Sequence, residues 1–169
     1  MEHTDLSRNT LSFLGLAAEY CSALENALHT DKEEFTTLML KLLPRLYITM
    51  SDTDPAMLEE QNEPLATYLE PEQYDSIRHG VAVLMGEDDT YLETFEQDMK
   101  YSDTPIAATI SESLADIYQP LLNCALAVRD AGAELAAQAV AECRESFNEY
   151  WAQTLCNVLR PLNALHYNI

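Results

Sequence analysis

Apolar residues recur along most of this chain at intervals of three and four residues, and this spacing limits its fold more than any other feature. The first series is Leu11, Leu14, Ala18, Cys21, Leu24 and Leu28. Residues spaced in this way share one face of an α-helix, so each series predicts a helix with one buried side. No segment has the alternation of a β-strand, and the chain has only 4 glycines. The pattern therefore predicts an all-α protein.

Five main helices are expected, bounded by residues that typically begin or end a helix. The signals, in chain order, are a capping box at Thr30 and Glu33, Pro71, Gly86, Thr104 with Pro105, a stop at Asp130 to Gly132, and Pro161. Pro44 and Pro120 fall inside helical series, where a proline removes a hydrogen bond and is expected to bend the helix. One short extra helix is predicted at 91–97.

The segment 51–70 interrupts the helical pattern. It is polar and acidic, contains two prolines and has no sustained period, so we expect a long connection there. A chain of 169 residues suits one domain. We therefore predict a single helical domain over 1–169, built as a bundle of four to five mostly antiparallel helices with a long acidic connection and one short extra helix.

The charge of the chain is strongly unbalanced. Nine lysines and arginines face 29 aspartates and glutamates, which gives a formal charge of −20. Such a surface repels the phosphates of nucleic acids and lacks the basic patches that bind anionic membranes. The first residues do not have the pattern of a signal peptide, and no segment is long and apolar enough to span a bilayer. We expect a cytoplasmic protein that binds neither nucleic acid nor membrane directly.

Motifs of known catalytic and cofactor sites are missing from the sequence. There is no phosphate-binding glycine loop, no dinucleotide-binding motif, no H-E-x-x-H and no serine nucleophile elbow. The four cysteines lie among apolar residues and include no C-x-x-C pair, which argues against structural zinc. We expect no cofactor and no metal, and the sequence favours a protein that is not an enzyme.

The most unusual segment is 87–103, where acids are interleaved with aromatic residues. The candidate binding residues are Asp88, Asp89, Tyr91, Asp98, Tyr101 and Asp103, together with Asp116 further along the chain. Carboxylates on a loop between helices suit a hard cation or a basic partner, and tyrosine is enriched at contact surfaces. In the structural alternative, one of the first aspartates caps the short helix and Asp103 or Thr104 caps the next. No EF-hand spacing is present, so the structural alternative is favoured.

Asp116 is a candidate for a different reason, because it falls beside the apolar stripe of its helix. Glu112, one turn earlier, forms a like-charge pair with it. Arg144 and Arg160 are the arginines that could neutralise this carboxylate. If Asp116 is buried without such a partner, it becomes the best single functional candidate.

Several blocks of sequence resemble one bacterial protein family. They are LAAEYCSALENA at 16–27, KLLPRLY at 41–47, GEDDTYLETF at 86–95, YSDTPIAATISESLADIYQ at 101–119 and ECRESFNEYWAQTL at 142–155. These blocks cover most of the chain and are similar to the domain-of-unknown-function family 5063. Pro120 departs from the family pattern. The resemblance implies an all-helical fold in a bacterial cytoplasmic protein, and it implies no particular activity.

The leading functional hypothesis is a non-enzymatic helical protein that binds another protein through 87–103. It rests on the missing catalytic motifs and on the large negative charge. One alternative is a small-ligand or metal-dependent enzyme that uses the carboxylates of the same segment. A second alternative is an acidic mimic of nucleic acid, which requires acids spaced along one face like phosphates. The sequence leaves the oligomeric state open.

Overall fold

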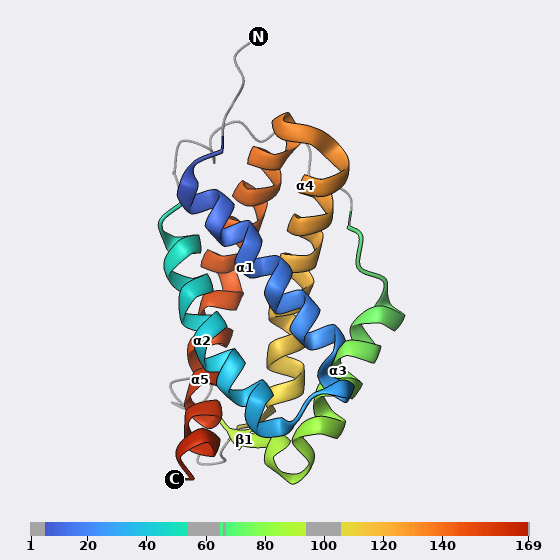
Figure 1. Cartoon of the computed structure of the whole chain (residues 1–169), viewed down its shortest axis with the longest axis vertical. Helices are drawn as coiled ribbons and strands as arrows, with labels where there is room; N and C mark the ends of the chain where they lie inside the picture. Colours follow the sequence, from blue (N-terminus) through green and yellow to red (C-terminus); the bar gives the residue numbers. More distant parts are fainter. Residues whose placement is uncertain (1–5, 54–64, 66, 94–105, 169) are drawn as a thin grey trace.

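We describe the fold from a computed structural model, which covers residues 6–53, 65, 67–93 and 106–168, without the side chains of 131–134. The elements are α1 (Arg8–Glu25), η1 (Ala27–His29), α2 (Lys32–Ser51), α3 (Pro71–Met85), η3 (Gly86–Asp89), β1 (Thr90–Leu92), β2 (Ala107–Thr109), α4 (Ile110–Ser146), η5 (Phe147–Trp151) and α5 (Ala152–Tyr167). The short elements η1 and η3 are 3₁₀ turns, and η5 is a π-helical segment. Five α-helices pack as a bundle along the long axis of the molecule (Figure 1). This confirms the predicted helical bundle.

A small hairpin lies at the lower end of the bundle, where the sequence suggested a short helix. Strands β1 and β2 pair antiparallel, with Tyr91 opposite Ala108. The expectation of a helix at 91–97 and of no strands is therefore wrong within the described residues. Strands of three residues are too short to produce a detectable alternation of apolar and polar residues.

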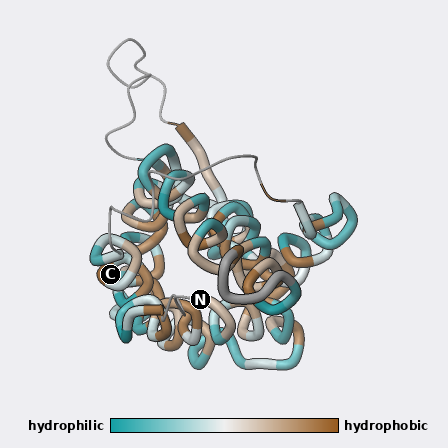
Figure 2. The backbone as a smooth tube through the Cα atoms, turned by 90° about the horizontal axis from the view of Figure 1, so that it is seen from above, coloured by the Kyte–Doolittle hydropathy of each residue, from teal (hydrophilic) through white to brown (hydrophobic). Residues whose placement is uncertain are grey.

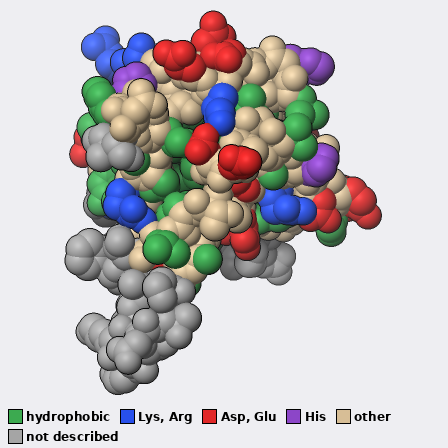
Figure 3. Space-filling model, turned by 90° about the horizontal axis from the view of Figure 1, so that it is seen from below, with side chains coloured by type: hydrophobic (Ala, Val, Ile, Leu, Met, Phe, Trp, Pro, Cys, Tyr) green, Lys and Arg blue, Asp and Glu red, His purple; other side chains and the backbone are tan. Residues whose placement is uncertain are grey.

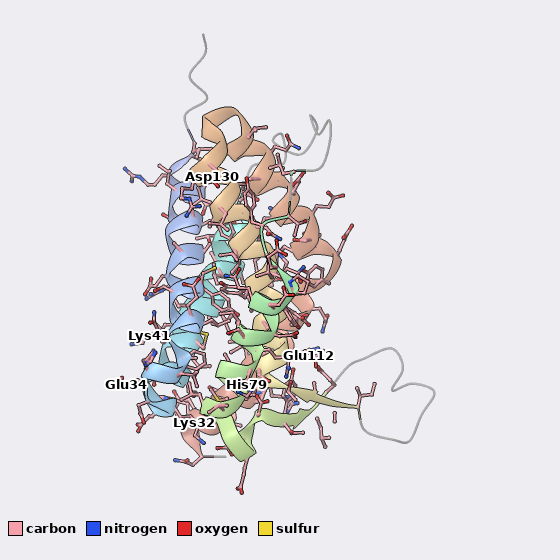
Figure 4. The ribbon with its side chains drawn as sticks, turned by 90° about the vertical axis from the view of Figure 1, so that its right-hand side faces the viewer. Lys32, Glu34, Lys41, His79, Glu112 and Asp130 are labelled. Atoms are coloured by element: carbon pink, nitrogen blue, oxygen red, sulfur yellow. The ribbon has the colours of Figure 1, made fainter. Side chains whose placement is uncertain are left out.

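Helix α4 reverses direction along its length, although its helical assignment is continuous. The sulfur of Cys143 lies 3.8 Å from the carbonyl oxygen of Pro120, whereas a straight helix would separate these residues by about 35 Å. Figure 1 shows the chain rising through α4, turning at the upper end and descending toward α5. Asp130 lies at that upper end (Figure 4). The predicted stop at Asp130 to Gly132 thus takes the form of a chain reversal.

Two helix starts differ from the sequence prediction. Asp31, not Thr30, caps α2, and its carboxylate accepts from the backbone N–H of Glu34. Helix α4 begins after Thr109, whose hydroxyl accepts from the N–H of Glu112 at 3.1 Å. Thr104 and Pro105, the predicted start, lie outside the described residues. The later start follows from the strand at 107–109, because that stretch pairs with β1.

The buried face of α1 is rotated relative to the predicted one. Leu11 and Leu28 are 56% and 58% exposed, although the spacing placed them in the core. The residues buried instead are Thr10, Phe13, Ala17, Tyr20, Cys21 and Leu24. Burying Phe13 and Tyr20 removes more apolar surface from water than burying leucine and alanine at the alternative positions would.

Prolines lie inside three of the helices without ending them. Pro44, Pro120 and Pro161 fall within α2, α4 and α5. Pro161, expected to close the last helix, is followed by helix to Tyr167. Pro120 and Pro161 are themselves buried, so packing on the bundle compensates for their missing N–H groups. Gly86, in contrast, ends α3 as predicted, with a φ of 57° that favours glycine.

The core joins all five helices and contains three large aromatic side chains whose polar atoms are hydrogen-bonded. Tyr20 donates to the carbonyl oxygen of Leu114 at 2.6 Å, and Trp151 donates to that of Cys143 at 3.2 Å. Tyr118 donates to the carboxylate of Glu25 at 2.9 Å. Hydrophobic and hydrophilic positions alternate around the helices (Figure 2). None of the described helices is long and apolar enough to cross a membrane.

Candidate functional site

The structure places four of the seven candidate residues. Asp98, Tyr101 and Asp103 lie outside the described residues. The others are Asp88, Asp89, Tyr91 and Asp116, which lie near the hairpin and the first turns of α4. They do not converge on one point, because each has a different set of neighbours.

Asp89 caps helix α4, which begins further along the chain at Ile110. Its side chain is buried, and one carboxylate oxygen accepts from the backbone N–H of Ser111 at 2.8 Å. The other oxygen accepts from the hydroxyl of the same serine at 2.7 Å. A carboxylate suits the N-terminus of a helix because the free N–H groups there carry partial positive charge. The sequence predicted that Asp88 or Asp89 caps the short helix, whereas Asp89 caps the start of α4.

Asp88 and Tyr91 are also engaged inside the chain. The carboxylate of Asp88 contacts the ammonium group of Lys32 at 2.7 Å. Tyr91 is buried, and its hydroxyl lies 2.8 Å from that of Ser113. The guanidinium of Arg160 lies 5.8 Å from the centre of the tyrosine ring, within the range of a cation–π contact. Burial raises the pKa of Tyr91 to about 12, so its hydroxyl keeps its proton at neutral pH.

Asp116 lacks a cationic partner in the described chain. Its half-buried carboxylate accepts a hydrogen bond of 2.5 Å from the hydroxyl of Tyr74. Burial raises the pKa of this carboxyl above its ordinary value near 3.8, and the tyrosine hydrogen bond only partly opposes that shift. Neither arginine suggested by the sequence forms an ion pair with it. Arg160 donates to the carbonyl oxygen of Leu92.

Arg144 is committed to the end of another helix. Its Nη1 donates to the carbonyl oxygens of Met50 at 2.8 Å and Ser51 at 3.1 Å. The same nitrogen donates to the hydroxyl of Thr53 at 2.7 Å. A guanidinium at the C-terminus of α2 satisfies carbonyl groups that have no helical partner. The suggestion that this arginine neutralises Asp116 is therefore wrong.

Asp116 opens into a cavity of about 320 Å³, which we call the acidic pocket. Its carboxylates come from Glu93, Glu112 and Asp116, and its amide side chains come from Gln153 and Asn157. The strand segment 106–109 forms a further wall. Glu112 lies where the hairpin meets the bundle (Figure 4).

Glu93 adds to the acidic pocket a carboxylate with one unpaired oxygen. Its Oε1 accepts from Tyr91 at 3.2 Å. Its Oε2 is buried and has no hydrogen-bond partner among the described residues. A buried carboxylate oxygen without a donor is costly, since it has lost water and gained nothing in exchange. A donor or a positive charge entering the pocket would satisfy it.

The contribution of α5 to this pocket was not predicted from the sequence. Gln153 and Asn157 are four residues apart, so they project from one face of α5. The only sequence signal is two amides at helical spacing, which is common on exposed helix faces. Within the described residues, no three His, Cys, Asp or Glu side chains are grouped so as to hold a metal ion.

Comparison with known proteins shows the family. A family model described as "Domain of unknown function (DUF5063)" matches residues 4–168. The chain belongs to the DUF5063 family. The crystal structure of protein BF1032 from Bacteroides fragilis has a TM-score of 0.82 and 29% sequence identity to this chain. The match covers 96% of this chain and 95% of that one. No curated protein matches. The DUF5063 fold is thus found at full length in a bacterial protein.

Proposed function

We propose that this DUF5063 protein binds another protein, and that the acidic pocket receives a basic side chain of that partner. The observation that carries the proposal is Asp116, a half-buried carboxylate that faces a cavity and has only a neutral donor within the described chain. A lysine or arginine entering the pocket would supply the missing positive charge. Opposite charges at contact distance favour the ionised form of a carboxylate and reverse the effect of its burial.

The size and charge of the pocket favour a single side chain. A volume of about 320 Å³ is at the low end for small-molecule sites. The formal charge of −20 attracts basic partners at long range. Gln153 and Asn157 line the same cavity, and Nε2 of Gln153 donates to Oδ1 of Asn157 at 3.0 Å. An amide oxygen such as that of Gln153 can accept a hydrogen bond from a guanidinium or ammonium group.

The edge of the hairpin beside the pocket favours an extended segment of the partner. Glu93 donates its backbone N–H to the carbonyl oxygen of Ile106 at 2.7 Å. Because hydrogen-bonded pairs alternate along an antiparallel ladder, the pair of Leu92 and Ala107 is a non-hydrogen-bonded one. The N–H and C=O groups of Ala107 therefore point away from β1, and Ala107 is exposed. Such an edge can accept a further strand.

The partner-binding residues in this proposal differ from those that the sequence predicted within 87–103. Asp89 and Tyr91 are buried and hydrogen-bonded within the chain, so they support the surface from beneath. Leu92 is 54% exposed and offers an apolar contact beside Glu93. The partner-binding residues we propose are Glu93, Glu112 and Asp116.

The proposal can be tested by calorimetry with a blocked tri-arginine peptide and, as a neutral control, a blocked tri-glutamine peptide. At 0.15 M salt the Debye length is about 8 Å, so distant surface charges contribute little. We expect Asp116→Asn to weaken binding of the arginine peptide at least about tenfold, equivalent to about 1.4 kcal/mol. Glu19→Gln removes one exposed charge from α1 and serves as the matched control.

Comparing these two variants distinguishes binding in the acidic pocket from a general attraction of the peptide to the negative charge of the protein. If the proposal is right, Glu19→Gln changes the affinity less than twofold, and Glu112→Gln has an intermediate effect because Glu112 is exposed. If Asp116→Asn and Glu19→Gln weaken binding equally, the peptide responds to net charge alone. That result, or no binding of the arginine peptide, would overturn the proposal.

A further inference from the structure

A second and larger cavity, which we call the basal pocket, is lined in part by β1, whereas the acidic pocket is lined by β2. Its volume is about 770 Å³, within the range of small-molecule sites. It is lined by α2, by the η3–β1 segment and by α5, through Lys32, Thr36, Asp88, Tyr91, Arg160 and His166. Lys32 lies at the lower end of the molecule (Figure 4). Its size and its chemistry both differ from those of the acidic pocket.

Thr36 gives this pocket an unsatisfied polar group. The side chain is 3% exposed and lines the pocket, and its hydroxyl oxygen has no hydrogen-bond partner among the described residues. A hydroxyl in a helix can donate to a carbonyl of the preceding turn, yet this one does not. Buried polar groups in native proteins are nearly always paired, so an unpaired one in the lining of a cavity is a candidate contact for a molecule bound there.

The basic side chains of the pocket are held in place by neighbours. The Nζ of Lys32 contacts Asp88 at 2.7 Å and donates to the carbonyl oxygen of Met85 at 3.3 Å. Arg160 packs over the ring of Tyr91, 5.8 Å from its centre, and donates to the carbonyl oxygen of Leu92. A guanidinium has five N–H donors, so Arg160 retains donors for a carboxylate.

The acidic side chains of the pocket limit the charge of the ligand. Glu33, Glu87 and Asp88 line it together with Lys32 and Arg160, giving three negative and two positive side chains. Viewed from below, the lower end of the molecule mixes acidic, basic and histidine side chains (Figure 3). A multiply charged anion would be repelled by this lining. A molecule with one carboxylate and one ammonium group finds an opposite charge for each.

We infer that the basal pocket binds a small zwitterion of the α-amino acid class, with its carboxylate at Arg160 and Thr36 and its ammonium group toward Glu33 and Glu87. The hydroxyl of Thr36 donates to the carboxylate, which removes the cost of its isolation. Arg160 supplies a paired, planar set of donors that matches a carboxylate. The apolar residues of the same lining, Pro161, Ala164 and Leu165, contact the amino-acid side chain.

Free α-amino acids, screened singly by thermal shift and then by calorimetry, test this inference. At least one is expected to raise the melting temperature and to bind saturably. Its N-acetyl form lacks the ammonium group and its amide form lacks the carboxylate, and we expect each to bind at least tenfold more weakly. If no amino acid binds, or if the N-acetyl or amide form binds equally well, the inference is wrong.

Substitutions in the lining of the basal pocket test whether the amino acid binds there. Thr36→Val keeps the shape of the side chain and removes the hydroxyl, so it should raise the melting temperature while weakening binding at least tenfold. Arg160→Gln should weaken binding to a similar degree. Arg45→Gln, at an exposed arginine on α2, is the control and should change nothing. Asp116→Asn should leave amino-acid binding intact, which separates this site from the acidic pocket. Binding that survives both pocket variants would overturn the assignment.

Discussion

At the scale of single residues, Asp116 should make the folded state less stable as pH rises. Burial raises its pKa in the folded protein above the ordinary value near 3.8. The folded state therefore binds this proton more tightly than the unfolded state does. The stability from this group is complete below about pH 3.8 and is lost as pH rises through the folded pKa.

Replacing this carboxylate with an amide should remove that pH dependence. Asp116→Asn keeps an oxygen that accepts from Tyr74 and has no charge to desolvate. We expect it to melt about 1–3 °C higher than the wild type at pH 7 and to lose that advantage near pH 3. Thermal unfolding across this pH range measures the difference. Glu19→Gln corrects for the general relief of negative charge. An equal gain from both variants would show that Asp116 has no special role.

At the scale of elements, the start of α4 depends on a side chain from the segment before the hairpin. Asp89 forms two hydrogen bonds with Ser111 and places negative charge at the helix N-terminus. Asp89→Ala should lower the free energy of unfolding by about 1–3 kcal/mol, because it leaves a buried N–H and hydroxyl unpaired. Denaturant titration measures this loss.

The neighbouring aspartate provides the control for that prediction. Asp88 forms an ion pair with Lys32 in which both side chains are more than 40% exposed. Exposed ion pairs contribute about 0–1 kcal/mol, so Asp88→Ala should have a small effect. Equal losses from the two alanine variants would contradict the capping role of Asp89.

At the scale of the whole molecule, the spacing of apolar residues predicts the bundle but not its internal geometry. The spacing identifies helices because burial requires one apolar face per helix. It did not reveal the rotation of α1, since that depends on which surfaces pack together. The reversal within α4, in contrast, falls at the stop that the sequence predicted at Asp130 to Gly132. The two short strands were missed for the same reason as the rotation of α1. Thr90–Leu92 is a strand because it pairs with Ala107–Thr109, and the paired residues are 15 to 19 positions apart in the sequence.

The candidate site could be predicted only in part for the same reason. Asp116 was identifiable because it lies beside an apolar stripe. Its surroundings were not, because Gln153 and Asn157 come from a helix about 40 residues away and Glu93 comes from the hairpin. The two arginines that the sequence suggested as partners of Asp116 bind elsewhere. Arg144 lies at the end of α2 and Arg160 lies beside Tyr91. Contacts between distant segments, which carry the chemistry here, leave little trace in one sequence.

The protonation of Asp116 during binding tests the central claim most directly. Carboxyl carbon shifts of the aspartates, recorded by NMR as pH is varied, give the pKa of Asp116 in the free protein and in the presence of saturating tri-arginine peptide. In the free protein this pKa should lie above its ordinary value near 3.8. If a basic side chain enters the acidic pocket, the pKa should fall below that value in the complex. A pKa that stays raised while the peptide is bound would contradict the account.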